Sequence, residues 1–212
     1  MIKLKKLAKP AVLEINAAIW TKTVLDKISV GVKPTDVEKS RYRHPEVKKV
    51  LIKEVNGKCA YCESKLLHVT YGDVEHIVPK STKIEIAFEW DNLTLACDVC
   101  NTNKSDNFSH GVGFVDPYIH NPVDHFNFVG GLVFAKSGDN DARLTEETLK
   151  LNRAELVERR NERIRYLREQ VEVIKRAPTA LQTVLLASLH DELSEDKEYS
   201  AVAQACLPCL LA

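Results

Sequence analysis

The segment "DNLTLACDVCN" (Asp91–Asn101) contains a Cys-x2-Cys pair, and the same spacing occurs earlier in "CAYC" (Cys59–Cys62). Each such knuckle turns the backbone so that both sulfur atoms can face one ion, and tetrahedral zinc takes four thiolates. Two separate pairs with identical spacing therefore predict one structural zinc, held by Cys59, Cys62, Cys97 and Cys100. The alternative is that four buried thiols pack in a core without a metal.

The insert between the two knuckles is 34 residues long, which exceeds an ordinary zinc ribbon. It contains "YGDVEHIVPKS", in which Glu75 precedes His76 within a β-branched run. We predict a strand over 71–78, a second strand at "LTLA", and a helix from about 97 to 105. Asn92 starts the second strand, and Asn101 lies in the first turn of the helix.

The composition indicates a globular chain in a reducing compartment. The 212 residues include 30 basic and 30 acidic side chains, so the formal net charge is zero. A neutral chain is not held along nucleic acid by bulk charge, although a local basic face remains open. No apolar run reaches the length of a membrane span, and no signal-peptide cleavage site follows the N-terminal lysines. Six cysteines, four of them in tight pairs, favour a cytoplasmic location.

The segments on both sides of the two knuckles are predicted to be mainly helical. Apolar spacing predicts helices over 11–28 and 45–57, and "FNFVGGLVFAK" predicts a hairpin that turns at Gly130–Gly131. Asn152 is expected to cap a long helix, with Glu155 completing a capping box. That helix should run to about Arg176, and two more are expected over 180–190 and 195–206. We divide the chain into a helical region (1–56), a core (57–108), a loop with a hairpin (109–140) and a second helical region (141–212).

Other polar and sulfur-containing residues carry weaker signals. Cys206 and Cys209 form a third pair without further ligands nearby, so we expect small apolar residues on a buried or partner-facing tail; a second metal or a redox pair is the alternative. His68 is expected to be structural. The loop after the motif holds three histidines that either contact substrate or lie on a polar surface, and the surface is favoured: His110, His120 and His125. The run of charges over 153–176 is expected to be a solvated helix face or, alternatively, a phosphate-tracking surface.

The motif "EHIVP … DNLTLACDVCN..K" resembles the HNH endonucleases, over about residues 57–106. The resemblance implies an α+β fold with a ββα-metal core, flanked here by N- and C-terminal helices. It also implies that His76 is the general base, that Glu75 and Asn101 hold one divalent metal, and that Asn92 fixes the loop that positions the histidine. Asn103 is the alternative to Asn101. Oxygen ligands favour Mg²⁺ or Mn²⁺ at this second site.

The outer segments "CAYCE", "VDP" and "TLKLNRAELVERR" resemble the HNH subunit of Septu-type and retron-associated anti-phage systems. This resemblance implies a nuclease that cuts nucleic acid, with DNA favoured over RNA, beside an ATPase subunit. The competing reading is a non-catalytic zinc-binding module that recognises nucleic acid or protein, in which the acid–histidine pair is only structural.

Overall fold

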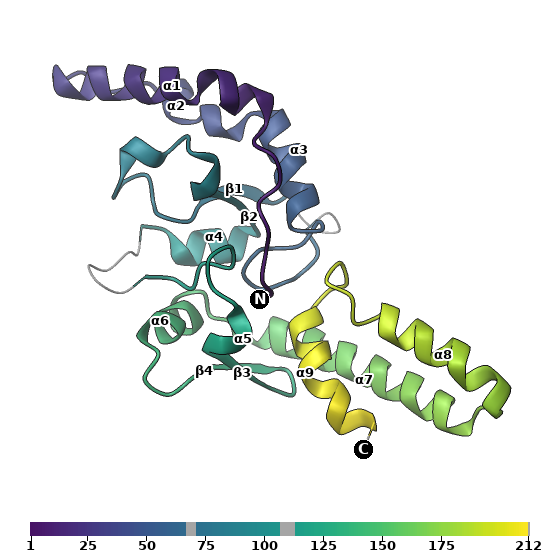
Figure 1. Cartoon of the computed structure of the whole chain (residues 1–212). Coiled ribbons are helices and arrows are strands. Elements are labelled where there is room, and N and C mark those ends of the chain that lie inside the picture. The colour runs from purple at the N-terminus through teal and green to yellow at the C-terminus, as the bar shows by residue number, and fades with distance from the viewer. Residues whose placement is uncertain (67–70, 107–112, 212) are drawn as a thin grey trace.

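The computed structural model describes residues 1–66, 71–106 and 113–211, and it shows an α+β fold with helices on both sides of a small central unit (Figure 1). In that unit, β1 (Asp73–His76) pairs antiparallel with β2 (Leu93–Ala96), and α4 (Asp98–Lys104) follows directly. The register places Glu75 opposite Thr94 and His76 opposite Leu93. The expected strand–strand–helix order is confirmed.

The start of α4 is fixed by a cysteine. Cys97 is the N-cap of the helix, and its Sγ accepts a hydrogen bond from the amide of Cys100 at 3.4 Å. An N-cap side chain satisfies one of the amides that the first helical turn leaves without a partner. The second knuckle therefore both presents its sulfurs and begins the helix that carries Asn101. Two 3-10 turns, η2 (Ile84–Ile86) and η3 (Trp90–Asn92), lie in the connection between the strands.

The N-terminal helices cover the central unit from one side. They are α1 (Ala11–Ser29), α2 (Asp36–Lys39) and α3 (Pro45–Glu54), with the turn η1 (Arg41–Arg43) between α2 and α3 (Figure 1). The expected helices over 11–28 and 45–57 correspond to α1 and α3. The first turn of α3 contains Pro45, whose missing amide hydrogen costs nothing at that position.

A buried network attaches the segment before α1 to the rest of the molecule. The ammonium of Lys6 lies 4.3 Å from the ring centroid of Trp90 and 4.2 Å from that of Tyr118. It also binds the Glu54 carboxylate at 3.1 Å and the Leu93 carbonyl. The hydroxyl of Tyr118 donates to Glu54 at 2.6 Å. Four distant segments are thus joined at one buried charge pair.

After the central unit the chain forms α5 (Pro122–His125) and a hairpin of β3 (Phe126–Val129) and β4 (Leu132–Ala135). The turn falls at Gly130, which has φ +56°, so the hairpin expected at Gly130–Gly131 is confirmed. The next helix, α6 (Asn140–Thr148), lies at the start of the region expected to be helical, although no separate helix was predicted there. It begins where Asp139 accepts a hydrogen bond from the Ala142 amide.

The long helix α7 (Ala154–Arg176) begins one residue later than the capping pattern predicts. Its N-cap is Arg153, without a side-chain cap bond, so the predicted capping box at Asn152 and Glu155 is wrong. Asn152 instead binds both backbone groups of Val133, accepting from its amide at 2.9 Å and donating to its carbonyl at 2.7 Å. A strand edge offers a donor and an acceptor together, so this contact replaces the helix cap.

The last helices are α8 (Thr179–Asp191) and α9 (Ser200–Leu211), which both pack against α7 (Figure 1). The helix expected over 195–206 begins later because the buried Lys58 binds the carbonyls of Glu195 and Lys197 at 2.6 and 2.8 Å, which holds that stretch in a turn. The main hydrophobic core extends from Met1 to Val202. The division of the chain at residues 56, 108 and 140 stays a prediction. Among the described residues, no helix combines the length and apolarity needed to cross a membrane.

Candidate active site and metal centre

A cavity of 180 Å³ brings residues of the central unit together with residues of the N-terminal region. Glu75 and His76 reach it from the end of β1, and Asn101 reaches it from α4. Asn92, the fourth predicted residue, is not part of its lining. The other residues around the cavity are Tyr42, Arg43, Val74, Pro79, Lys80, Ser105 and Asp106.

His76 is held in one orientation within this cavity. Its Nε2 lies 2.9 Å from the carbonyl oxygen of Ala87, and the edge-to-face contact with Tyr42 has a centroid distance of 4.3 Å. Because a carbonyl can only accept, Nε2 carries the proton and Nδ1 keeps the lone pair. Burial lowers the pKa of His76 to about 4. The imidazole is therefore neutral at pH 7, which is the state that a proton acceptor needs.

Glu75 forms a buried ion pair with Lys104. The Lys104 ammonium donates to Glu75 Oε1 at 2.8 Å and to the His76 carbonyl at 2.7 Å, and the lysine is fully buried. Burial raises the pKa of Glu75, and the Lys104 charge opposes this rise. Lys104 therefore does two things at once: it favours the ionised carboxylate, and it fixes the backbone next to the imidazole.

We expect Lys104→Met to destabilise the protein by about 3–5 kcal/mol, because it leaves the Glu75 carboxylate buried without a partner. Chemical denaturation followed by circular dichroism measures the change. The double variant Lys104→Met/Glu75→Gln should recover part of the loss, since it removes the unpaired charge. Lys83→Met, at an exposed position, is the matched control. A Lys104→Met variant as stable as this control would show that the pair contributes nothing.

Asn92 does not line the cavity, but its side chain forms hydrogen bonds to the backbone of the connection between β1 and β2. Its Oδ1 accepts from the Val78 amide at 2.8 Å, while its Nδ2 donates to the carbonyls of Val78 and Ile86, both at 3.1 Å. Ile86 directly precedes Ala87, whose carbonyl binds His76. The side chain of Asn92 thus fixes the connection between the strands at both ends, and with it the oxygen that orients the imidazole.

Asn101 presents its amide to the cavity from the first turn of α4. Its Nδ2 donates to Asp73 Oδ2 at 2.9 Å, so the ligand atom it can offer to a cation is Oδ1. Asn103, the alternative at sequence level, lies elsewhere: its Nδ2 is 3.5 Å from the Leu149 carbonyl, and it does not line the cavity. Of the two asparagines, Asn101 is therefore the one that lines the cavity together with Glu75.

The four paired cysteines form a separate, buried cluster that can hold a metal ion. Their sulfur atoms all lie within 4.8 Å of one another, and Cys62 Sγ is 3.8 Å from Cys97 Sγ. Both terminal nitrogens of Arg153 lie 3.9 Å from Cys100 Sγ, so a cation lies beside the sulfur atoms. Within the described part of the chain, Cys206 and Cys209 lie outside this cluster, on α9.

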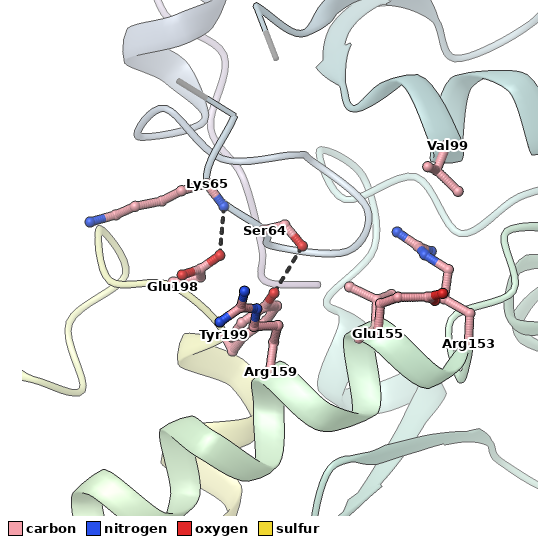
Figure 2. A pocket seen from close by; sticks show the side chains of 9 residues that line it. Ser64, Lys65, Val99, Arg153, Glu155, Arg159, Glu198 and Tyr199 are labelled. Atoms are coloured by element: carbon pink, nitrogen blue, oxygen red, sulfur yellow. Dashed lines mark hydrogen bonds between the residues drawn. The ribbon is translucent and has the colours of Figure 1, made fainter. Parts of the chain in front are cut away.

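A larger cavity, of 830 Å³, is lined by residues that follow the first knuckle, by Val99 of α4, by residues at the start of α7 and by the two residues before α9 (Figure 2). Figure 2 shows Ser64 bonded to the Tyr199 hydroxyl and the Lys65 amide bonded to Glu198. The larger cavity is lined by charges of both signs: the basic residues are Lys65, Arg153 and Arg159, and the acidic residues are Glu155 and Glu198. We place the chemistry in the smaller cavity, because only that one contains the acid–imidazole pair.

His120 and His125 of the following loop are not part of the cavity. His125 Nδ1 lies 2.7 Å from Asp139 Oδ2, and the rings of His120 and His125 are 5.0 Å apart. His68 and His110 lie outside the described residues. Sequence reasoning did not single out Tyr42, Arg43, Lys80 or the pairing of Lys104 with Glu75. Only Lys104 had a local signal, its place in the motif.

Comparison with known proteins agrees with this geometry. Residues 59–107 match the family model described as HNH endonuclease. The chain is 27% identical over 203 residues to Septu protein PtuB of Bacillus mycoides (strain KBAB4), which covers 76% of this chain and 66% of that protein. It is 31% identical over 109 residues to Septu protein PtuB of Bacillus thuringiensis, covering 51% and 42%. The chain therefore spans less than two thirds of the length of either relative.

Proposed function

We propose that this chain is a metal-dependent HNH endonuclease that hydrolyses phosphodiester bonds in nucleic acid, with DNA favoured over RNA. The observation that carries the proposal is the neutral, oriented imidazole of His76, placed in one cavity with Glu75 and Asn101 inside the segment that matches the HNH endonucleases. A recognition module has no need of an imidazole held by both Ala87 and Tyr42.

In this proposal, His76 accepts a proton from the attacking water at Nδ1. The Ala87 carbonyl keeps the other ring nitrogen protonated, and Asn92 keeps that carbonyl in place. The neutral form is the proton-accepting form, and burial maintains it. General base catalysis by a positioned side chain contributes typically about 10²–10⁴-fold.

Two metals fit the residues present. Glu75 and Asn101 provide a carboxylate and an amide oxygen, which suit Mg²⁺ or Mn²⁺. When bound there, such a cation neutralises charge on the phosphate and stabilises the leaving oxygen. The cysteine cluster suits zinc: with Zn–S bonds of about 2.3 Å, tetrahedral sulfurs lie about 3.8 Å apart. The Cys62–Cys97 separation is 3.8 Å.

A cleavage assay tests the nuclease proposal. Purified protein, alone and together with the product of a neighbouring ATPase gene, is incubated with supercoiled plasmid in Mg²⁺, Mn²⁺ or EDTA. We expect nicking that requires the added cation and that is lost in Glu75→Gln, because the carboxylate ligand is removed. Nicking in EDTA at the same rate would contradict metal dependence. If neither DNA nor RNA is cut under any of these conditions, the non-catalytic module is the better description.

We further propose that the chain works in the cytoplasm as the nuclease subunit of a Septu-type defence complex with an ATPase. The support is its similarity to Septu protein PtuB over 203 residues. The apolar C-terminus gives little additional support, because α9 packs against α7 and β3 and buries residues 200–203. Co-purification of the chain with the product of a neighbouring ATPase gene tests the partnership. If the two proteins are expressed together and the chain purifies without that product, the partnership is contradicted.

A further inference from the structure

Although the net charge of the chain is zero, basic and acidic residues are distributed unevenly along the sequence. Residues 1–80 contain 16 lysines and arginines against nine acidic residues, which gives a net charge of +7. Residues 81–212 contain 14 basic and 21 acidic residues, which gives −7. The basic part includes the helices that cover the central unit (Figure 1). A charge asymmetry of this kind is a feature of chains that bind nucleic acid with one part of their surface.

Two of these cations line the small cavity. Arg43 comes from η1, outside the segment that matches the HNH endonucleases, and Lys80 follows β1. The Lys80 ammonium donates to the Tyr42 hydroxyl at 3.1 Å, and the Arg43 guanidinium lies 5.5 Å from the centroid of the same ring. Tyr42 in turn packs on His76. One aromatic ring therefore places both cations next to the imidazole.

Because Lys104 neutralises Glu75 from outside the lining, the cavity keeps two cationic side chains, Arg43 and Lys80, against one carboxylate, Asp106. Lys104 is paired with Glu75, whereas neither Arg43 nor Lys80 forms an ion pair within residues 1–66, 71–106 and 113–211. Asp106 is the other acidic residue of the lining, and it is exposed. Cations held close together repel one another unless an anion binds between them. A phosphodiester backbone is such an anion, and Arg and Lys are its usual ligands.

The basic part of the chain also carries an exposed aromatic side chain. Tyr71, two residues before β1, is 84% exposed, and the Lys48 ammonium of α3 lies 6.0 Å from its ring centroid. Exposed rings beside cations are surfaces on which unpaired bases stack. The basic N-terminal region thus offers both a phosphate contact and a base contact on the side of β1.

We propose that Arg43 and Lys80 bind the nucleic-acid backbone at the Glu75–His76 cavity, so that the N-terminal helical region forms part of the substrate-binding surface. This inference rests on the proposed nuclease function. It assigns substrate binding to residues on both sides of the first knuckle, and it predicts that the HNH segment alone binds its substrate incompletely.

A binding experiment without added divalent cation separates substrate binding from cleavage. The full-length protein is titrated into a fluorescein-labelled DNA oligonucleotide, single-stranded or duplex, and anisotropy is recorded at several salt concentrations. We expect Arg43→Gln/Lys80→Gln to weaken binding by about tenfold or more, and to lower the slope of log affinity against log salt by about two. Arg43→Gln alone should lower the slope by about one.

The matched control is Arg168→Gln/Lys175→Gln, which removes the same two charges from exposed positions on α7. It should bind within about twofold of the wild type, with an unchanged slope. An equal loss of affinity in both double variants would show that binding depends on general positive charge and not on a specific site, and it would overturn the inference. Wild-type affinity in Arg43→Gln/Lys80→Gln would also overturn it, and so would an absence of binding by the wild type.

The cleavage assay keeps the two proposals distinct. If the wild type nicks DNA in Mg²⁺ but the cavity variant binds as tightly as the wild type, the nuclease stands and the phosphate contact is wrong. If the wild type neither binds nor cuts, both are wrong. Zinc content and thermal unfolding of each variant show that its fold is retained.

Discussion

Replacing His76 by alanine is expected to lower the rate of cleavage by about 10²–10⁴-fold, because the proton acceptor is lost. The rest of the machinery should survive this change. The cysteine cluster lies apart from the small cavity, and the Lys104–Glu75 pair contacts only the backbone of His76. The measurement is the initial rate of plasmid nicking in Mg²⁺, together with zinc content and a thermal melt of the same sample.

Two further variants make the result specific. His76→Gln keeps a side-chain donor for the Ala87 carbonyl and fills much of the same space, yet it cannot act as a base near neutral pH. It should be as inactive as the alanine variant and more stable. His190→Ala removes an exposed histidine from α8 and should cut at the wild-type rate. Nicking by His76→Gln at the wild-type rate would show that His76 is not the base.

The pH dependence of the wild-type rate follows from the same site. A base must be neutral to accept a proton, and the pKa of His76 is lowered to about 4. The imidazole therefore remains neutral as the pH falls from 7 to about 5.5, and the rate should fall little over this interval. A histidine with an ordinary pKa of about 6.5 would lose most of its activity there.

Removing the metal from the cysteine cluster is expected to unfold much of the protein. The apparent binding free energy of structural zinc is about 10–16 kcal/mol in zinc-finger peptides. The free energy of unfolding of a whole domain is only about 5–15 kcal/mol. The cluster joins the two ends of the HNH segment, and Cys97 also caps α4. We expect about one zinc per chain, and we expect a strong chelator to abolish the circular dichroism signal of the native state.

Cys97→Ser isolates the metal from the helix cap. Serine is a good N-cap, so the variant can still begin α4 while it lacks the thiolate. We expect it to lose zinc and cooperative unfolding, whereas Cys209→Ser, at an exposed position on α9, should keep both. A metal-free protein that retains the native melting transition would show that the cluster is a set of packed thiols.

Short-range patterns in the sequence account for the parts of the site that were predicted correctly. The spacing within Cys59–Cys62 and Cys97–Cys100 requires both sulfurs of each pair to lie on one side of a turn, and the structure brings all four together. The β-branched run before the proline became β1. These features depend on neighbours within a few residues, which a sequence shows directly.

Contacts between distant segments account for what was missed. Tyr42 packs on a histidine 34 positions later, and nothing in the local pattern "SRYRHP" distinguishes it from a surface turn. Asn152 was expected to cap a helix, but a strand edge at Val133 offered two hydrogen bonds instead of one. In both cases tertiary packing decided between local alternatives that a single sequence leaves open.

The position of Lys58 has a consequence for the order of events during synthesis. Its ammonium is buried beside the first knuckle and is satisfied by carbonyls 137 and 139 residues further along the chain. While the ribosome is still making α7 and α8, those carbonyls do not exist, and Lys58 has only the Glu63 carboxylate, 3.6 Å away in the finished structure, as a nearby partner. We therefore expect the central unit to close only after the stretch before α9 has emerged, so that incomplete chains are released without a finished catalytic cavity. Under the proposed nuclease function, this late closure delays activity until the stretch before α9 has been synthesised.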